Sequence, residues 1–146
     1  MRSFVDTNVL VYTFAEDDPG KQAAATALMR QLIDANEVVI STQILQELFV
    51  TLIRKFAATL SIAEAEDIVR DLANQPVVQV DVPIILAAMT RVQTDSLSFW
   101  DALIVEAALV AGATRLLTED LQHGRVFDGR LRVENPFLPP VPGSLA

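Results

Sequence analysis

Residues 4–10 read FVDTNVL and set a carboxylate, a hydroxyl and an amide directly after an apolar run near the start of the chain. Residues 3–6 predict a short buried strand, because the run is apolar and polar residues bound it. A strand that only filled a core would continue with valines. The polar exit at Asp6, Thr7 and Asn8 therefore indicates either a turn or a functional site at the end of this strand.

The rest of the chain alternates between two kinds of pattern. Short runs of β-branched residues and leucine predict strands at residues 38–40, 77–80, 115–117 and 131–133. Helical patterns predict helices over residues 22–36, 44–56, 61–74, 83–94 and 99–111. Ser61 and Glu64 have the spacing of a capping box, Pro83 suits a first helical turn and Gly112 suits a helix end.

Strands that alternate with helices favour parallel pairing through right-handed crossovers. We therefore expect a three-layer α/β/α sandwich with a central, mostly parallel sheet of four or five strands. Residues 1–137 are expected to form a single domain, followed by a proline-rich C-terminal tail at residues 138–146.

Length and composition narrow the class of protein. The 146 residues are enough to bury a core without disulfide bonds or structural metals. The chain has no cysteine, which excludes a disulfide scaffold, a zinc–thiolate site and a cysteine nucleophile, and fits a reducing cytosol. Every apolar run is shorter than the roughly 18 residues that a membrane span needs, so we expect a soluble, cytoplasmic protein.

The charge balance is acidic, with 11 basic and 19 acidic residues and a net charge of −8. On charge alone, such a protein does not favour nucleic acid as a partner. That conclusion fails if the acidic residues surround bound cations, because a metal ion reverses the local sign of the charge. The positions of the acidic residues therefore decide the kind of site.

Four acidic residues from distant parts of the chain are expected at one edge of the sheet, since sites in open parallel sheets form beyond the carboxyl ends of the strands. Asp6 ends the first strand, and Asp120 follows the strand at residues 115–117 in the same way. Asp101 lies at the start of the last helix, and Glu47 lies in the second turn of the helix after the second strand.

Each of these residues also has a purely structural interpretation. Asp6 can form a turn, and Asp120 can cap a helix. Asp101 can pair with Ser98 in a capping box, and Glu47 can be a solvated charge. Their convergence favours a shared cation, because like charges brought close together repel and raise one another's pKa. Oxygen ligands without cysteine suit Mg²⁺ or Mn²⁺ rather than zinc.

Other polar and aromatic residues are weaker candidates. His123 lies in a polar loop, and Phe99 and Trp100 are expected to pack at a helix entry rather than to stack on bases. The basic residues that can guide a substrate backbone are Arg54, Lys55, Arg91, Arg125 and Arg130, although each taken alone is more typical of an ordinary surface charge.

Three segments together carry a family resemblance: FVDTNVLVY at residues 4–12, ISTQILQEL at residues 40–48 and LSFWDALIVEAALVAGATRLLTEDLQHGR at residues 97–125. They resemble the PIN-domain ribonucleases, and specifically the VapC-type toxins of bacterial toxin–antitoxin pairs. The resemblance runs from Arg2 to about Phe137, and the third segment is its most specific part.

The resemblance implies a set of site residues. By position, the family's catalytic and metal-binding carboxylates match Asp6, Glu47, Asp101 and Asp120, and its supporting hydrogen-bonding residues match Asn8 and Thr118. Thr118 is equally well explained as a cap for the turn into Glu119 and Asp120, and Thr7 as a hydrogen bond that shapes the turn after Asp6.

The resemblance also implies an activity and partners. We expect hydrolysis of RNA phosphodiester bonds with Mg²⁺ or Mn²⁺, a homodimer, and inhibition by a small antitoxin protein whose C-terminal segment covers the acidic cleft. The alternatives are a housekeeping PIN nuclease that is not a toxin and a non-catalytic acidic binding module. A phosphatase of the haloacid dehalogenase type is disfavoured for two reasons. Such an enzyme needs a second aspartate where this chain has Asn8, and it needs a lysine far downstream, whereas Lys55 is the last lysine of this sequence.

Overall fold

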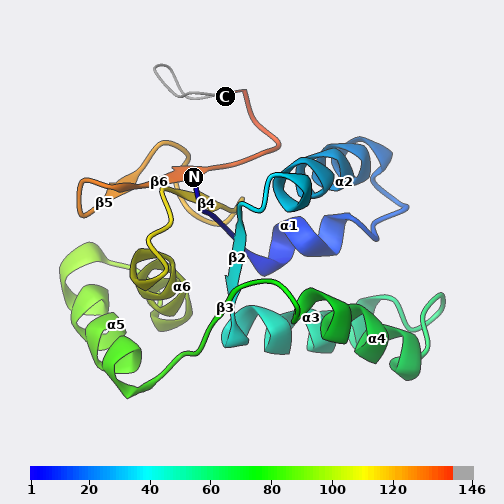
Figure 1. Cartoon of the computed structure of the whole chain (residues 1–146), viewed down its shortest axis with the longest axis horizontal. Coiled ribbons are helices and arrows are strands. Elements are labelled where there is room, and N and C mark those ends of the chain that lie inside the picture. The colour runs from blue at the N-terminus through cyan, green and yellow to red at the C-terminus, as the bar shows by residue number, and fades with distance from the viewer. Residues whose placement is uncertain (140–146) are drawn as a thin grey trace.

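A central sheet of six strands runs through the molecule in the order β3-β2-β1-β4-β6-β5 (Figure 1). The computed structural model describes residues 1–139. The strands are β1 (Ser3–Val5), β2 (Val38–Ser41), β3 (Val77–Val78), β4 (Arg115–Leu117), β5 (Val126–Phe127) and β6 (Leu131–Glu134). Neighbouring strands are parallel except for β5 and β6, which pair antiparallel. The predicted mostly parallel sheet is confirmed, but the strand count is too low, because the two-residue β5 is too short to form an apolar pattern.

Six helices in the described chain flank this sheet. They are α1 (Thr7–Tyr12), α2 (Pro19–Asp34), α3 (Thr42–Lys55), α4 (Ile62–Leu72), α5 (Val82–Asp95) and α6 (Phe99–Val110). Five of them agree with the sequence prediction to within a few residues at each end. Helix α2 begins earlier than predicted, because Asp18 caps it by accepting a hydrogen bond from the Lys21 N–H and Pro19 occupies the first turn.

The short α1 is absent from the sequence prediction. Asp6 has an extended backbone and caps α1, and its carboxylate accepts a hydrogen bond from the Thr7 N–H. The polar exit from β1 is therefore a helix start. Other caps follow the prediction, since Ser61 and Glu64 form both hydrogen bonds of a capping box and Gly112, just after α6, has a φ of 70°.

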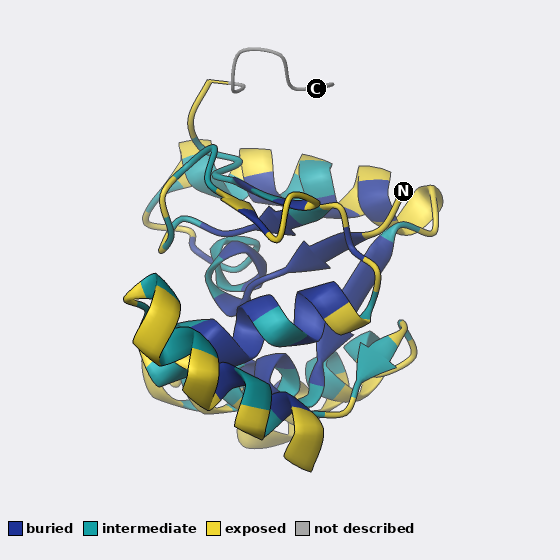
Figure 2. Ribbon diagram, turned by 90° about the vertical axis from the view of Figure 1, so that its left-hand side faces the viewer, coloured by how far each residue is buried: buried dark blue, intermediate teal, exposed yellow. Residues whose placement is uncertain are grey.

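The helices cover both faces of the sheet, with α5 and α6 on one side and α1 to α4 on the other (Figure 1). The strands form the buried centre of the molecule, and exposed residues lie on the outer surfaces of the helices (Figure 2). Helix α6 is apolar nearly all round and packs between α5 and the sheet. This is the three-layer α/β/α arrangement predicted from the sequence.

The two aromatic residues at the start of α6 differ in exposure. Phe99 packs against a small core cluster that includes Ile84 and Ala88 of α5, as expected. Trp100 also packs at the helix entry, as predicted, because its ring meets the Phe99 ring edge to face with centroids 5.3 Å apart. Trp100 nevertheless remains 65% exposed.

The strand order reverses beside β1. The chain passes from β1 to β2 and β3 on one side and then returns to β4 on the other. Strands β1 and β4 pair in parallel with Val5 opposite Leu117, and the Asp6 N–H donates to the Leu117 carbonyl at 3.0 Å. The carboxyl ends of these two strands therefore meet at the switch point, where ligand sites form in open parallel sheets.

Two further sequence predictions concern the C-terminal tail and membrane spans. The tail is predicted at residues 138–146, and residues 140–146 lie outside the described part of the chain. In residues 1–139, no helix combines the length and the apolar character needed to cross a membrane.

Arg91 joins three parts of the fold. Its guanidinium donates to Asp95 of α5 at 2.6 Å, to Glu106 of α6 at 2.6 Å and to Asp128 in the β5–β6 turn at 2.9 Å. The Arg91 side chain is only 12% exposed. Arg91 is therefore a structural link, and the prediction that it is a candidate for guiding a substrate is wrong, because its donors are already engaged.

We expect Arg91→Met to lower the free energy of unfolding by about 2–3 kcal/mol, because Glu106 and Asp95 would keep partly buried charges without a partner. The matched control is Arg70→Met, which breaks an exposed ion pair with Glu66 and should cost less than about 0.5 kcal/mol. Urea unfolding of both variants measures the difference. Equal losses in the two variants would contradict the structural role of Arg91.

Candidate functional site

The Asp6 carboxylate is buried at the carboxyl end of β1 and is held by hydrogen bonds on both oxygens. Asp6 Oδ1 accepts from the Thr7 N–H at 2.7 Å. Asp6 Oδ2 accepts from the Thr118 hydroxyl at 2.7 Å and from the Asn8 amide at 3.3 Å. The carboxylate therefore has a defined orientation that residues on two neighbouring strand exits determine.

Thr118 combines the two roles that the sequence left as alternatives. Its fully buried hydroxyl donates to the Asp6 carboxylate and accepts a hydrogen bond from the Asp120 N–H at 3.1 Å. The same oxygen also accepts from the Asn8 amide at 3.2 Å. Thr118 thus positions a carboxylate and shapes the turn after β4 at the same time.

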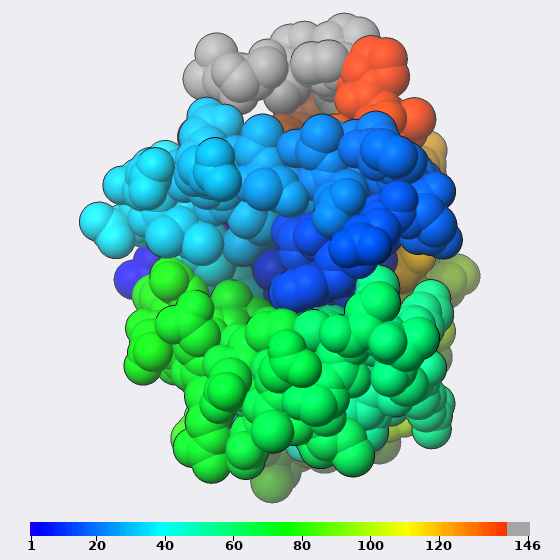
Figure 3. Space-filling model, turned by 90° about the vertical axis from the view of Figure 1, so that its right-hand side faces the viewer, coloured from blue at the N-terminus to red at the C-terminus, as the bar shows by residue number. Residues whose placement is uncertain are grey.

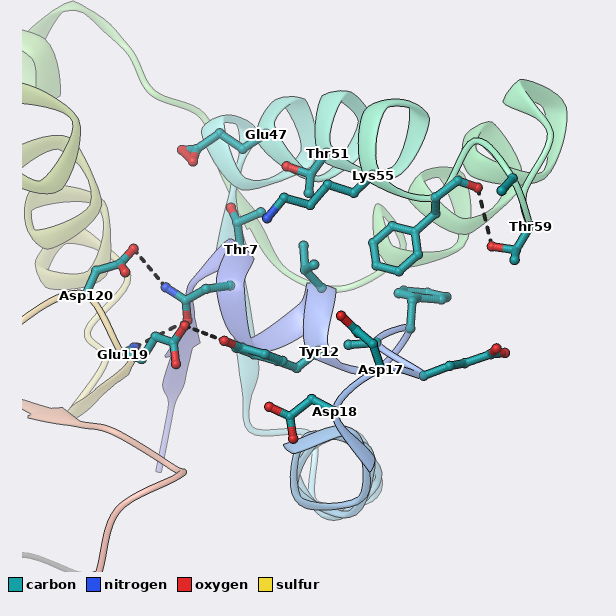
Figure 4. Close-up of a pocket in the computed structure, with 17 residues that line it drawn as sticks. Thr7, Tyr12, Asp17, Asp18, Glu47, Thr51, Lys55, Thr59, Glu119 and Asp120 are labelled. Carbon is teal, nitrogen blue, oxygen red and sulfur yellow. Dashed lines mark hydrogen bonds between the residues drawn. The ribbon is translucent and has the colours of Figure 1, made fainter. Parts of the chain in front are cut away.

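Asn8 connects the end of β1 with the segment after β4. Its amide nitrogen donates to Asp120 Oδ2 at 3.0 Å, and its carbonyl oxygen accepts from the Glu119 N–H at 3.3 Å. Figure 4 shows the hydrogen bond that reaches Asp120. The structure therefore brings Asp6 and Asp120 to the same edge of the sheet, as the strand exits predict.

Glu47 reaches this edge from α3 and is held by a residue that the sequence analysis missed. Gln43 is buried, and its amide nitrogen donates to Glu47 Oε1 at 2.8 Å and to the Trp100 carbonyl at 3.2 Å. Gln43 therefore ties Glu47 to the start of α6, next to Asp101. The available signal was its position four residues before Glu47, on the same helix face.

Asp101 occupies the first turn of α6. The Ser98 hydroxyl caps this helix by accepting from the Asp101 N–H at 3.1 Å, so the capping interpretation is correct for the backbone of Asp101. Its carboxylate is half-buried, and this burial raises its pKa, with a further contribution from the nearby charge of Asp120. The Asp101 carboxylate therefore lies close enough to Asp120 for the two charges to repel each other.

Burial and neighbouring charges raise the pKa values of Asp6, Glu47 and Asp101. Burial is the main cause of the shift of Asp6, whose pKa rises to about 7, and the charges of Glu47 and Asp120 raise it further. Burial also raises the pKa of Glu47, and the charges of Asp101 and Asp120 add to the shift. Such mutual repulsion is expected where carboxylates from different elements converge. The carboxylate group is the name used below for Asp6, Glu47, Asp101 and Asp120.

Thr7 differs from its expected role. Its backbone N–H, not its side chain, donates to Asp6 at the helix start. Its hydroxyl is buried without a partner at hydrogen-bond geometry, although it lies near enough to Glu47 to lower the pKa of that carboxyl. A buried hydroxyl without a partner, beside a carboxylate of the group, is a polar atom available to a ligand.

The chemistry of these residues fits a hard divalent cation, since the group offers carboxylate oxygens together with hydroxyl and amide oxygens nearby. In the described part of the chain, no three or more acidic or histidine side chains lie close enough together to form a ready metal cluster. The donor types therefore suit Mg²⁺ or Mn²⁺, but the side chains are not gathered around one point.

A cavity of about 850 Å³ adjoins the carboxylate group. Glu47 and Asp120 line it, together with Thr7 and Asn8, and it continues between α1 and α3 toward Thr59 (Figure 4). At its edge, Glu119 accepts hydrogen bonds from the Tyr12 hydroxyl at 2.8 Å and from Lys21 Nζ at 3.0 Å. Lys21 is not among the residues predicted from the sequence.

The other polar candidates have structural partners or lie on the surface. His123 accepts a hydrogen bond from the Asn135 N–H and contacts the Pro139 carbonyl through its other ring nitrogen. Arg125 donates to the Asp95 carbonyl. Arg54 and Arg130 are exposed, and Lys55 lines the cavity. Lys55 is thus the basic candidate that lies beside the carboxylate group.

Comparison with known proteins agrees with this arrangement. A family model of the PIN domain matches residues 3–127. No curated protein matches the sequence. Among solved structures, a toxin–antitoxin complex from Klebsiella pneumoniae contains a similar chain, with a TM-score of 0.66 and 19% identity over 92% of this chain and 97% of that one.

Two further structures show the same fold. The DNA-bound VapBC complex from Salmonella typhimurium has a TM-score of 0.64 and 16% identity over 93% of this chain and 98% of that one. VapC20 from Mycobacterium tuberculosis, a toxin that cleaves the sarcin–ricin loop, has a TM-score of 0.58 and 20% identity over 78% of this chain and 86% of that one.

The raised pKa of Asp6 predicts how the stability of the metal-free protein changes with pH. The folded state binds a proton more tightly than the unfolded state, so the contribution of Asp6 to stability falls as the pH rises from 3.8 to about 7. Wild-type protein in chelator should therefore lose about 4 kcal/mol relative to Asp6→Asn between pH 4 and pH 8. Urea unfolding of both proteins across this range measures the loss, and parallel curves would contradict it.

Proposed function

Because the chain belongs to the PIN domain family, we propose that it is a metal-dependent ribonuclease and the toxin of a toxin–antitoxin pair. The observation that carries the proposal is the carboxylate group at the switch point of the sheet, where Thr118 and Asn8 orient Asp6 and Asp120. A single capping residue or surface charge would not need these converging hydrogen bonds.

Mg²⁺ or Mn²⁺ is the proposed cofactor. Mg²⁺ typically keeps several of its waters and takes one or two protein carboxylates, so it does not require a ready cluster of three. When bound, such an ion makes a water molecule more acidic and stabilises negative charge on the oxygens of the reacting phosphate. It would also offset the burial and the repulsion that together raise the pKa values of Asp6 and Glu47.

Each residue of the group has a proposed role. Asp6, Asp101 and Asp120 would hold one or two cations between them, and the two hydrogen bonds on Asp6 Oδ2 keep that carboxylate turned toward the site. Glu47 is a further ligand, direct or through water, and orients the attacking water. Gln43 holds Glu47 in place from the side. In hydrolysis the water oxygen would attack phosphorus and the bond to the leaving ribose oxygen would break, while the water gives a proton to solvent and the leaving oxygen takes one up from solvent.

The proposed partners are RNA, a small antitoxin and a second copy of the chain. Support for an antitoxin comes from the fold, which a chain of the Klebsiella toxin–antitoxin complex and the VapBC complex share. The antitoxin segment would cover the carboxylate group, where acidic residues favour a basic peptide. RNA as the substrate is consistent with the sarcin–ricin loop cleavage by the similar VapC20.

A non-toxin PIN nuclease is the alternative within the same family, and a non-catalytic acidic binding module is the alternative of a different class. The first predicts cleavage without toxicity. The second predicts no cleavage with any divalent ion.

We expect purified protein, separated from any partner, to cleave RNA with Mg²⁺ or Mn²⁺ and to stop when chelator is added. Asp6→Asn and Asp101→Asn should each reduce the cleavage rate by at least about 100-fold, because each removes a charge that holds the cation. Asp67→Asn, which removes an exposed carboxylate on α4, is the control and should cleave normally. Full activity in both site variants, with the fold intact by circular dichroism, would rule out this metal site.

The toxin assignment makes a separate prediction. Induced expression of the unchanged protein should arrest bacterial growth, and Asp101→Asn should not, because growth arrest would require RNA cleavage. Growth curves and plating after induction measure the effect. Normal growth with a protein that cleaves RNA in the test tube would favour the non-toxin nuclease.

A further inference from the structure

The part of the cavity that lies beyond the carboxylate group has a composition of its own. Helix α3 contributes Thr51 and Lys55 to one side, and the segment between α1 and α2 contributes Asp17 and Asp18 to the opposite side (Figure 4). On the face of the molecule seen in Figure 3, α1 lies between α2 and α4. This part of the cavity is called the side pocket below.

Lys55 is the one cationic side chain among the described residues that line the cavity. It has no hydrogen-bond or ion-pair partner within residues 1–139, whereas Arg91 and Lys21 are both engaged by carboxylates. Its side chain extends along α3 toward Thr7 (Figure 4). Lys55 is therefore available to a phosphate group next to the carboxylate group.

The side pocket also has an aromatic wall. Phe14 and Phe56 both line it, and their rings meet edge to face with centroids 6.3 Å apart. Both rings also pack on the main core, which holds them in place. An aromatic ring held in this way offers its face for stacking against an unstacked base.

Opposite Lys55, the acidic residues Glu16 and Asp17 are exposed at the edge of the side pocket. Carboxylates accept hydrogen bonds from the amino groups of bases, as in contacts with cytosine N4. Uracil offers only its N3–H, which lies between two carbonyl oxygens that repel a carboxylate, so these residues would select against it. Asp18 has a different task, because its carboxylate caps α2.

We propose that the side pocket binds one unpaired nucleotide of the RNA next to the cleaved bond, an inference that rests on the proposed function. Lys55 contacts the phosphate of this nucleotide, and the base lies against Phe14 and Phe56. Glu16 and Asp17 accept from an amino group of the base. The pocket therefore selects adenine, cytosine or guanine over uracil at one position beside the cut.

A nucleotide explains the side pocket better than a peptide does. A basic peptide would find the acidic edge attractive, but it would place positive charge beside Lys55 and leave that lysine without a partner. A nucleotide supplies a phosphate to Lys55, a flat face to the phenylalanines and a donor to Glu16 or Asp17. All three features of the pocket are then used by one ligand.

The test uses total RNA of the expression host, incubated with purified protein and Mg²⁺, with the new ends mapped by sequencing. The unchanged protein should deplete uridine at least about fivefold at one fixed position beside the cut. The double variant Glu16→Ala, Asp17→Ala should lose this depletion. Lys55→Met should lower cleavage about fivefold or more at all sites without changing the base preference, because a phosphate contact carries no sequence information.

Two matched variants separate the pocket from general effects of charge. Arg54→Met removes a neighbouring charge from the same last turn of α3 but not from the cavity, so it should change cleavage less than twofold. Asp67→Asn removes an exposed acid outside the cavity and should keep the depletion of uridine. Equal losses in Lys55→Met and Arg54→Met would overturn the role of Lys55.

The outcomes distinguish this inference from the proposed function. If the unchanged protein makes no metal-dependent ends, both are overturned. If it makes ends whose base preference and rate are unchanged in the Glu16, Asp17 and Lys55 variants, only the nucleotide pocket is overturned. A Lys55→Met protein that cleaves normally but resists the antitoxin would assign the pocket to a peptide instead.

Discussion

The buried carboxylate of Asp6, at the point where the strand order reverses, is the group on which the rest of the site depends. Burial raises its pKa to about 7, and the charges of Glu47 and Asp120 oppose its ionisation further. The hydrogen bonds from Thr118 and Thr7 act in the other direction and favour the charged form. Asp6 is therefore poised between a protonated state that the fold prefers and an ionised state that a cation would stabilise.

A site of this kind requires stability from the rest of the fold, since converging carboxylates oppose folding at neutral pH. The parallel strands, buried between two layers of helices, supply most of the apolar core. Arg91 adds a cluster of ion pairs that joins α5, α6 and the β5–β6 turn and includes none of the four carboxylates. Two clusters of acidic residues thus differ, because arginine pairs with the acids around Arg91 while the charges of the carboxylate group repel one another. A net charge of −8 is compatible with RNA as a substrate if cations occupy the carboxylate group.

Local chemistry made much of the fold predictable. Five of the six described strands, five helices and the caps at Ser61 and Gly112 follow from patterns within a few residues of one another. The placement of Asp6 and Asp120 also follows, because both residues come directly after parallel strands. The short α1 was missed, since an aspartate after a strand reads equally well as a turn or as a helix cap. The exposure of Trp100 and the ion pairs of Arg91 depend on what neighbouring elements leave open or supply, and no local pattern contains that information.

The sequence by itself therefore determined the fold class and which carboxylates reach one edge of the sheet, because hydrophobic periodicity and strand order act through the backbone. Only the tertiary structure decided how those carboxylates are held. Gln43 reaches both Glu47 and the carbonyl of Trp100, and Asn8 reaches Asp120 across more than 100 positions of the chain. The tertiary structure also decides that the buried Thr7 hydroxyl has no hydrogen-bond partner in the described chain. A hydrogen bond needs its donor and acceptor to lie within a few tenths of an ångström of about 2.9 Å, and only the packing of different elements sets those positions.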